Sequence, residues 1–200
     1  MNPAFMLICT LFSYAQGLIC NECVPHALDG SCSATKVQCT GVCSNSVMIA
    51  IDGSQKSSVH TQDCETPNQC QNSSFNFGTS KIVLTTKCCT TDLCNSGSFT
   101  ASLNDTQNGR KCFSCSATDC NSTVNCVGNE DRCIKAIVDS GGLKKMMKGC
   151  VTKNSCLGDF LTNMGYADVR CCKGNLCNGA SGVVQSILLL AISFISYIFH

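Results

Sequence analysis

The sequence contains no tryptophan, and only 6% of its 200 residues are aromatic. A composition this poor in large apolar rings does not provide the extensive core that an ordinary enzyme of this length buries. Charged residues are also scarce, at 14% of the chain, and 14 Lys plus Arg against 13 Asp plus Glu leave a net charge of +1. No excess of one sign attracts the chain to nucleic acid or to acidic lipid. No segment of about twelve residues shows helical periodicity, so the pattern predicts strands rather than helices.

Cysteine is the residue that the sequence has in excess. It accounts for 21 of the 200 residues, which is above the roughly 8–10% that marks a disulfide scaffold in an extracellular chain. Disulfide bridges therefore take the place of a large apolar core.

The amino-terminal segment predicts secretion. Residues 1–17 carry no charged side chain, and the apolar run 5–12 precedes Ala15-Gln16-Gly17, with small residues at both cleavage-determining positions. This pattern is typical of a secretory signal peptide. Removal of residues 1–17 also removes Cys9 and leaves 20 cysteines, an even number in an oxidising compartment.

The carboxy-terminal segment predicts a glycosylphosphatidylinositol (GPI) anchor. Small residues at 178–180, a spacer at 179–186 and an apolar tail at 187–200 match the attachment signal. The competing interpretation is a transmembrane helix, but the run from Val183 to Phe199 is only 17 residues long, contains Gln185, and is not followed by Lys or Arg. We expect attachment at Asn178, with Gly179 and Ser181 as alternatives.

The 20 remaining cysteines form an internal repeat of two sets of ten. Each set opens with C-x2-C, at Cys20 and at Cys112, and closes with Cys-Cys-x4-Cys-Asn, at Cys88–Asn95 and at Cys171–Asn178. A unit of about 70–80 residues is the size of a small domain. The sequence therefore predicts domains at 18–95 and 110–178, joined by a linker at 96–109 that is rich in Ser, Thr, Asn and Gly.

Alternating segments between the cysteines predict β-hairpins. In the first domain, strands at 46–51 and 57–62 flank the turn signal Asp52-Gly53. In the second, strands at 133–138 and 143–148 flank the turn 139–142, and a third strand precedes each double cysteine, at 81–87 and 164–170. The predicted fold class is all-β, small and disulfide-rich.

The ten-cysteine pattern that begins with C-x2-C and ends with Cys-Cys-x4-Cys-Asn resembles the three-finger domain of the lymphocyte-antigen and urokinase-receptor (LU) family. The resemblance covers nearly all of the expected mature chain, twice, and is similar to multi-domain members such as the urokinase receptor and the gamma-class phospholipase inhibitors. It implies that Asn95 and Asn178 brace each cysteine knot by side-chain hydrogen bonds. In the second domain Cys115 and Cys120 enclose only four residues, so we expect its first finger to be a stub. The resemblance also implies the pairings Cys20–Cys43, Cys23–Cys32, Cys39–Cys64, Cys70–Cys88, Cys89–Cys94, Cys112–Cys133, Cys115–Cys120, Cys126–Cys150, Cys156–Cys171 and Cys172–Cys177.

Catalytic and metal chemistry find little support in the residues. If all 20 cysteines are paired, none is a nucleophile or a zinc-ligating thiolate, which leaves the two C-x2-C motifs as structural. The histidines His26 and His60 are the only ones outside the apolar tail, and two flat hairpin domains do not readily supply the preorganised cleft of a hydrolase. We expect a protein that is not an enzyme and carries no cofactor.

Three N-glycosylation sequons lie in the expected mature chain: Asn72-Ser-Ser, Asn104-Asp-Thr and Asn121-Ser-Thr. In a secreted chain each is a candidate on an exposed loop or linker.

Charge is unequal between the domains, at −2 for residues 18–95 and +4 for residues 110–178. The second hairpin of the basic domain contains Lys144, Lys145 and Lys148, flanking Met146 and Met147. We predict that this basic strand, with its methionines exposed, binds an acidic partner surface. The alternative is a solvated strand without a partner.

Together these features predict a GPI-anchored binding protein on the extracellular face of the plasma membrane. It would act as a receptor, co-receptor or adhesion molecule that recognises an extracellular protein through its finger faces, with no role for nucleic acid. One alternative is a soluble secreted inhibitor similar to the gamma-class phospholipase inhibitors. The other is a structural or adhesion glycoprotein without a discrete ligand pocket.

Overall fold

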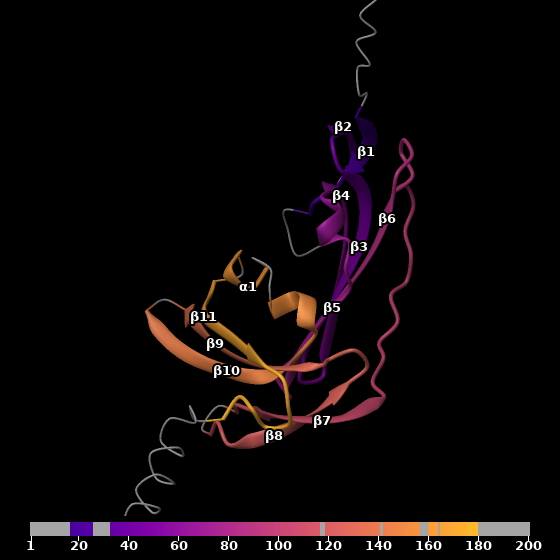
Figure 1. Cartoon of the computed structure of the whole chain (residues 1–200). Coiled ribbons are helices and arrows are strands. Elements are labelled where there is room, and N and C mark those ends of the chain that lie inside the picture. The colour runs from indigo at the N-terminus through magenta and orange to yellow at the C-terminus, as the bar shows by residue number, and fades with distance from the viewer. Residues whose placement is uncertain are drawn as a thin grey trace, which may run out of the picture.

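The computed structural model describes residues 17–25, 33–116, 119–140, 142–156, 160–163 and 165–179. The expected signal peptide, spacer and apolar tail lie outside these residues, except for Gly17 and Gly179, as do His26 and Cys32. The described chain is mostly β-structure, which confirms the all-β prediction (Figure 1). The strands are β1 (Leu18–Glu22), β2 (Thr35–Cys39), β3 (Val42–Asp52), β4 (Gln55–Glu65), β5 (Ser73–Asn76), β6 (Ser80–Cys89), β7 (Gln107–Ser114), β8 (Ser122–Val127), β9 (Arg132–Ser140), β10 (Leu143–Val151) and β11 (Tyr166–Cys172). Three short helical turns occupy Pro67–Gln69, Lys153–Cys156 and α1 (Phe160–Asn163).

In the first domain the long hairpin β3–β4 forms the middle finger. It turns at Asp52-Gly53, where Gly53 has a φ of +57° that a side-chain-bearing residue adopts only with strain. Strand β3 pairs with β4 on one side and with β6 on the other. Val47 and Ile49 of β3 are buried, so the apolar part of this strand is sheet core.

In the second domain the middle finger is β9–β10, and β9 lies between β10 and β11. The first finger, β7–β8, is a separate two-stranded sheet. Only residues 115–121 separate its strands, whereas residues 23–34 separate β1 from β2 in the first domain. The short connection agrees with the expected stub.

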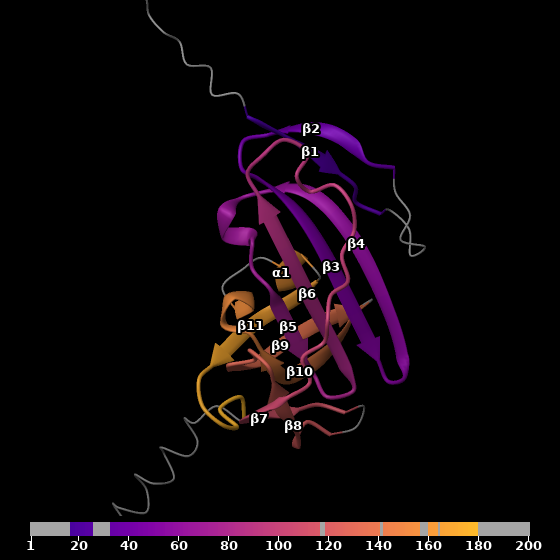
Figure 2. The same ribbon diagram turned by 90° about the vertical axis from the view of Figure 1, so that its right-hand side faces the viewer.

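The two domains share one seven-stranded sheet of order β11-β9-β10-β5-β6-β3-β4 (Figure 2). The junction is an antiparallel pairing between β10 and β5, with Cys150 opposite Asn76 and Val151 opposite Phe75. Gly149 permits the close approach, because a Cβ there would lie 2.9 Å from the carbonyl carbon of Asn76 and closer still to its oxygen. No sequence pattern indicates how the two domains are arranged, and this pairing defines it.

The largest apolar core also spans the junction. Phe75 and Phe77 of the first domain pack against Ile134, Ala136 and Val151 of the second, together with Leu161 of α1. The ring of Phe77 is stacked on Tyr166, with 6.3 Å between the ring centroids. The domains are therefore joined by buried apolar area as well as by strand pairing.

The chain between the domains lies along β6 (Figures 1 and 2). The ammonium of Lys87 lies 4.4 Å from the centre of the Phe99 ring, and Lys81 forms an ion pair with Asp105 at 2.6 Å. The expected linker was 96–109, and β7 already begins at Gln107.

Nine of the ten disulfides implied by the family resemblance are present among the described residues. Cys23 is also disulfide-bonded, and its expected partner Cys32 lies outside the described chain. The nine bridges are Cys20–Cys43, Cys39–Cys64, Cys70–Cys88, Cys89–Cys94, Cys112–Cys133, Cys115–Cys120, Cys126–Cys150, Cys156–Cys171 and Cys172–Cys177.

The asparagine that ends each repeat braces its knot, as expected. The Asn95 amide group donates to the carbonyls of Asn21 and Ser44 at 2.8 and 2.9 Å, and its oxygen accepts from the Asn21 N–H at 3.0 Å. Asn178 repeats the pattern with Phe113 and Ile134 in the second domain. Both side chains are buried, so each supplies partners to backbone groups that water does not reach.

Candidate binding surfaces

The middle finger of the second domain presents an apolar and basic end. Leu143 begins β10 with 78% of its surface exposed. Lys144 and Lys145 follow and are exposed, opposite Asp139 and Val138 of β9. An exposed leucine beside two lysines, on a hairpin fixed by nine registered residue pairs, is a surface that a partner protein can bind without ordering it first.

Lys148 does not belong to this exposed surface, contrary to the sequence prediction. Only 7% of it is exposed, and its ammonium donates to the Cys120 carbonyl at 3.3 Å and lies 5.6 Å from the centre of the Phe113 ring. Burial lowers the pKa of Lys148, the nearby Lys135 ammonium lowers it further, and Asp119 acts in the opposite direction. The first finger covers Lys148, so this lysine serves the packing of the domain.

The expected exposure of both methionines is also not observed. Met146 and Met147 are each partly buried, and Met147 packs against the core shared by the domains. The alternation of β10 places the two side chains on opposite faces of the sheet.

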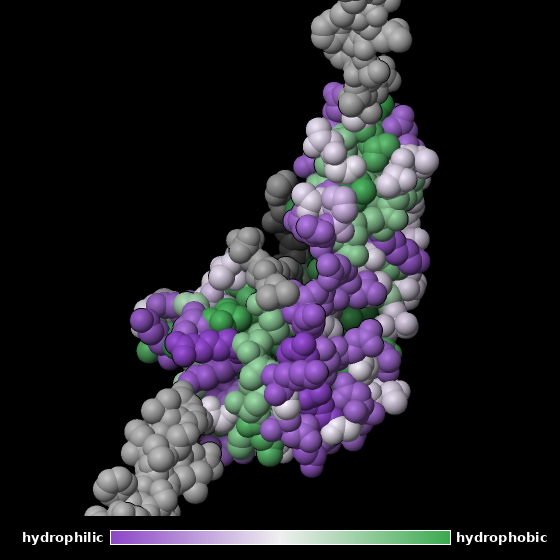
Figure 3. All heavy atoms as spheres, viewed as in Figure 1, coloured by the Kyte–Doolittle hydropathy of each residue, from purple (hydrophilic) through white to green (hydrophobic). Residues whose placement is uncertain are grey.

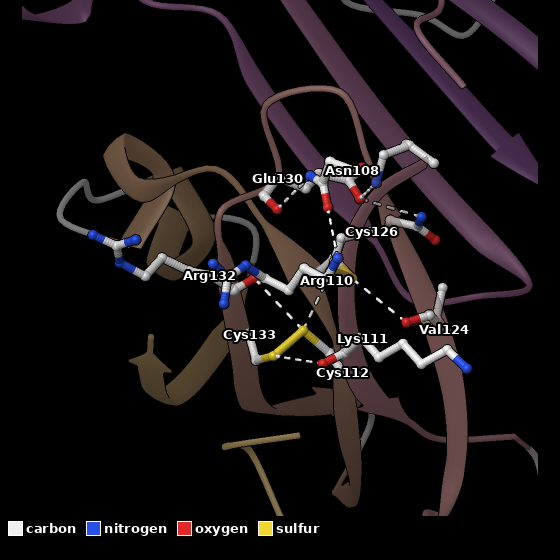
Figure 4. The surroundings of a disulfide bond; sticks show 12 residues. Asn108, Arg110, Lys111, Cys112, Val124, Cys126, Glu130, Arg132 and Cys133 are labelled. Atoms are coloured by element: carbon white, nitrogen blue, oxygen red, sulfur yellow. Dashed lines mark hydrogen bonds between the residues drawn. A yellow bond between two sulfur atoms is a disulfide. The ribbon is translucent and has the colours of Figure 1, made fainter. Parts of the chain in front are cut away.

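A buried carboxylate connects the domains. Glu130 is fully buried and precedes β9. Its carboxylate accepts from the Ser74 hydroxyl at 2.7 Å, from the Asn76 amide group at 3.3 Å and from the Val127 N–H at 2.9 Å. Its carbonyl accepts from Asn108 at 3.0 Å (Figure 4). No motif in the sequence pointed to this residue.

An open hollow of about 400 Å³ lies at the same junction. Hydrophilic residues gather there on the surface seen in Figure 3. The lining contains neither histidine nor cysteine, and His60 lies exposed on β4. The lining of this hollow therefore holds neither a Cys–His nor a Ser–His pair. Its lining residues are Gln71, Asn72, Asn129, Asp131, Thr152, Lys153 and Asn154.

Sulfur atoms of three cysteines lie close together at the knot of the second domain. The Sγ atoms of Cys112, Cys126 and Cys150 lie within 4.8 Å of one another. Each already belongs to a disulfide, Cys112 with Cys133 (Figure 4) and Cys126 with Cys150. Metal binding by cysteine requires thiolates, so this cluster is a packed pair of bridges.

The three sequons are at exposed positions. Asn72 lies at the rim of the junction hollow, Asn104 precedes β7, and Asn121 precedes β8. Exposure leaves all three as candidates for glycosylation.

Two family models match the chain in tandem. The u-PAR/Ly-6 domain model matches residues 16–97, and the model described as snake toxin and toxin-like protein matches residues 110–178. The fold and these matches define a protein of two tandem three-finger domains. The chain belongs to the u-PAR/Ly-6 (LU) family.

Proteins built from these domains are commonly receptors or secreted proteins that bind ligands, generally other proteins, and the domains are generally non-enzymatic. Members of the LU family are often found at the cell surface or secreted. Among the described residues, no helix has both the length and the apolar character needed to cross a bilayer.

Proposed function

We propose that the protein is a GPI-anchored receptor, co-receptor or adhesion molecule that binds an extracellular protein through its finger faces. The observation that carries the proposal is the exposed end of the second domain's middle finger, where Leu143, Lys144 and Lys145 meet solvent on a disulfide-stapled hairpin. The predicted signal peptide and the small-residue, spacer and apolar-tail pattern support the anchor.

The structure bears on the choice of attachment residue. Asn178 is 4% exposed, and its side chain makes three hydrogen bonds inside the knot. A transamidase needs an accessible, extended chain at the bond it cleaves, and attachment at Asn178 would require that this brace be opened. We therefore propose attachment at Gly179 or Ser181 rather than at Asn178.

The test uses the full chain expressed on cultured cells and treated with phosphatidylinositol-specific phospholipase C. Release of the protein from the surface is the expected result, and mass spectrometry of the released carboxy-terminal peptide then identifies the attachment residue. A variant that ends at Ser181, without the apolar tail, is the matched control and should appear in the medium. Surface retention after treatment would support a transmembrane tail, and full-length chain found only in the medium would support the secreted inhibitor.

N-glycosylation at Asn72, Asn104 and Asn121 belongs to the same proposal. Treatment of the released protein with peptide N-glycosidase should convert each occupied asparagine to aspartate, which mass spectrometry detects. An unchanged mass at all three positions would refute it.

A further inference from the structure

The three-stranded sheet of the second domain has two unlike faces. Side chains that pack into the shared core, such as Ile134, Ala136 and Met147, occupy one face. The alternate residues point to the other face. We call this second surface the back face and define it by Lys135 and Ile137 of β9, Lys144 and Met146 of β10, and Ala167 and Arg170 of β11.

Three cations stand in one row across the back face. Lys148 is opposite Lys135, and Lys135 is opposite Arg170 on its other side. Like charges placed directly opposite each other destabilise a sheet. Within the described chain Lys135, the central member of this row, forms no ion pair, whereas Arg170 is paired with Asp168.

An irregularity in β11 is what brings Arg170 into this row. The register shifts between Ala167 and Arg170, and Asp168 within the bulge has a φ of +48°. The extra residue lets Val169 pack against the shared core while Arg170 stands opposite Lys135. Strained bulges of this kind commonly redirect a side chain toward a functional surface.

An apolar row lies between the charged rows. Met146 is opposite Ile137, and Ile137 is opposite Ala167. Of the two carboxylates on this face, Asp139 accepts from the N–H of Gly142, and Asp168 accepts from Arg170 at 2.8 Å. Lys135, Lys144 and Arg170 against two engaged carboxylates leave the face positive, with a partly exposed apolar centre.

We propose that the back face binds an acidic segment of a partner protein. An apolar side chain of the segment packs on Met146, Ile137 and Ala167, and flanking carboxylates meet Lys135, Lys144 and Arg170. The apolar centre favours a protein over a sulfated polysaccharide, which carries the charge but has no apolar side chain to place there. The inference rests on the proposed protein-binding function and specifies its surface and the chemistry of its partner.

The test measures binding of synthetic peptides to the full chain displayed on cells. The probe is a short fluorescent peptide of Glu and Asp around a central Leu, and its companion has Ser in place of the Leu. We expect the Leu peptide to bind more tightly. Lys135→Glu or Lys144→Glu should each weaken its binding about tenfold or more. Met146→Ser should weaken binding of the Leu peptide and leave binding of the Ser peptide unchanged.

The matched control is Lys153→Glu, which makes the same charge change at an exposed position of the same domain, outside β9, β10 and β11. Its effect should stay within about twofold, and antibody staining checks that every variant reaches the surface. An equal loss for Lys145→Glu and Lys144→Glu would assign binding to the end of the hairpin and overturn the back face. If heparin binds, and its binding depends on the same lysines but not on Met146, the partner is a sulfated polysaccharide instead of an acidic protein. Absence of peptide binding by displayed protein would refute this inference, whereas phospholipase release tests the anchor separately.

Discussion

Replacing Glu130 by alanine should separate the two domains without unfolding either one. The substitution removes the acceptor for two side chains of the first domain, Ser74 and Asn76, and for the N–H of Val127. Hydrogen bonds to a charged group contribute about 1.5–3 kcal/mol each, and the Ser74 hydroxyl can rotate toward another acceptor. The bonds from Ser74 and Asn76 cross the junction, and at the lower end of this range their loss weakens it by about 3 kcal/mol.

Hydrogen exchange read by mass spectrometry is the appropriate assay, because the intact disulfides keep each domain folded while the junction opens. The N–H of Thr152 donates to the Ser74 carbonyl across the junction, and β5 and β10 pair beside it. Since each 1.4 kcal/mol is a factor of ten, exchange at residues 73–77 and 149–152 should become about a hundredfold faster or more.

A neighbouring carboxylate provides the control for this experiment. Asp131 is next in the chain, and its ion pair is formed with the adjacent Arg132. Asp131→Ala should leave exchange at the junction nearly unchanged. Glu130→Gln keeps one oxygen acceptor and should give an intermediate rate. Unchanged exchange in Glu130→Ala would show that the carboxylate does not hold the domains together, and the reasoning would fail.

Three further predictions concern single residues. Gly149→Ala should displace β5 from β10, because the new methyl group would collide with the β5 backbone, and normal protection at the junction would contradict this. Burial raises the pKa of Tyr166, which is stacked on Phe77, so ultraviolet titration should find tyrosinate forming above pH ~10, and a midpoint at the ordinary value would contradict it. Since the unfolded chain ionises first, the stability that Tyr166 contributes is present below its unfolded pKa and is lost as the pH rises through the folded pKa. Asn95→Ala removes three hydrogen bonds to backbone groups of the first knot and should cost about 2–4 kcal/mol in guanidinium unfolding, whereas Asn104→Ala at an exposed position should cost almost nothing.

The hairpins were predictable because they depend on local signals, whereas the disulfide pairing followed from the family resemblance. Paired cysteine motifs repeat at fixed spacings, and Asp52-Gly53 is a turn signal that acts over four residues. The closing asparagines were predictable from the family resemblance, since the Cys-Cys-x4-Cys-Asn pattern contains them. Each of these features lies within one repeat and is marked there by a short sequence motif.

The junction was not predictable, because it is formed by residues with weak local signals. Strand β5 is only four residues long, and its pairing with β10 joins positions about 75 residues apart. In the sequence, nothing distinguishes Gly149 and Glu130 from ordinary strand or loop residues. Their role follows only from the position of the partner strand. The burial of Lys148 was missed for a similar reason, since alternation gives the face of a side chain but not what covers that face.

The back face was not predicted, because the bulge in β11 changes which side chains of that strand share a face. Strict alternation along β11 would place Val169 opposite Lys135, and one extra residue at Asp168 exchanges it for Arg170. A bulge reverses the face of every residue that follows it. The cluster of cations can therefore be recognised only once the pairing register of β9, β10 and β11 is known.

The strand-paired junction and the proposed anchor together constrain where a partner comes from. A Cβ at Gly179 would lie 3.1 Å from the Phe113 ring, and Phe113 lies beneath Lys148 at the covered end of the back face. An anchor at Gly179 or Ser181 would be joined to the fold by at most about three residues, roughly 10 Å of extended chain. The back face would then be held close to the membrane, while the first domain, fixed by the β5–β10 pairing, could not swing toward it. Such a geometry favours a partner on the same cell, and lengthening the chain after Gly179 should extend binding to partners on opposing cells.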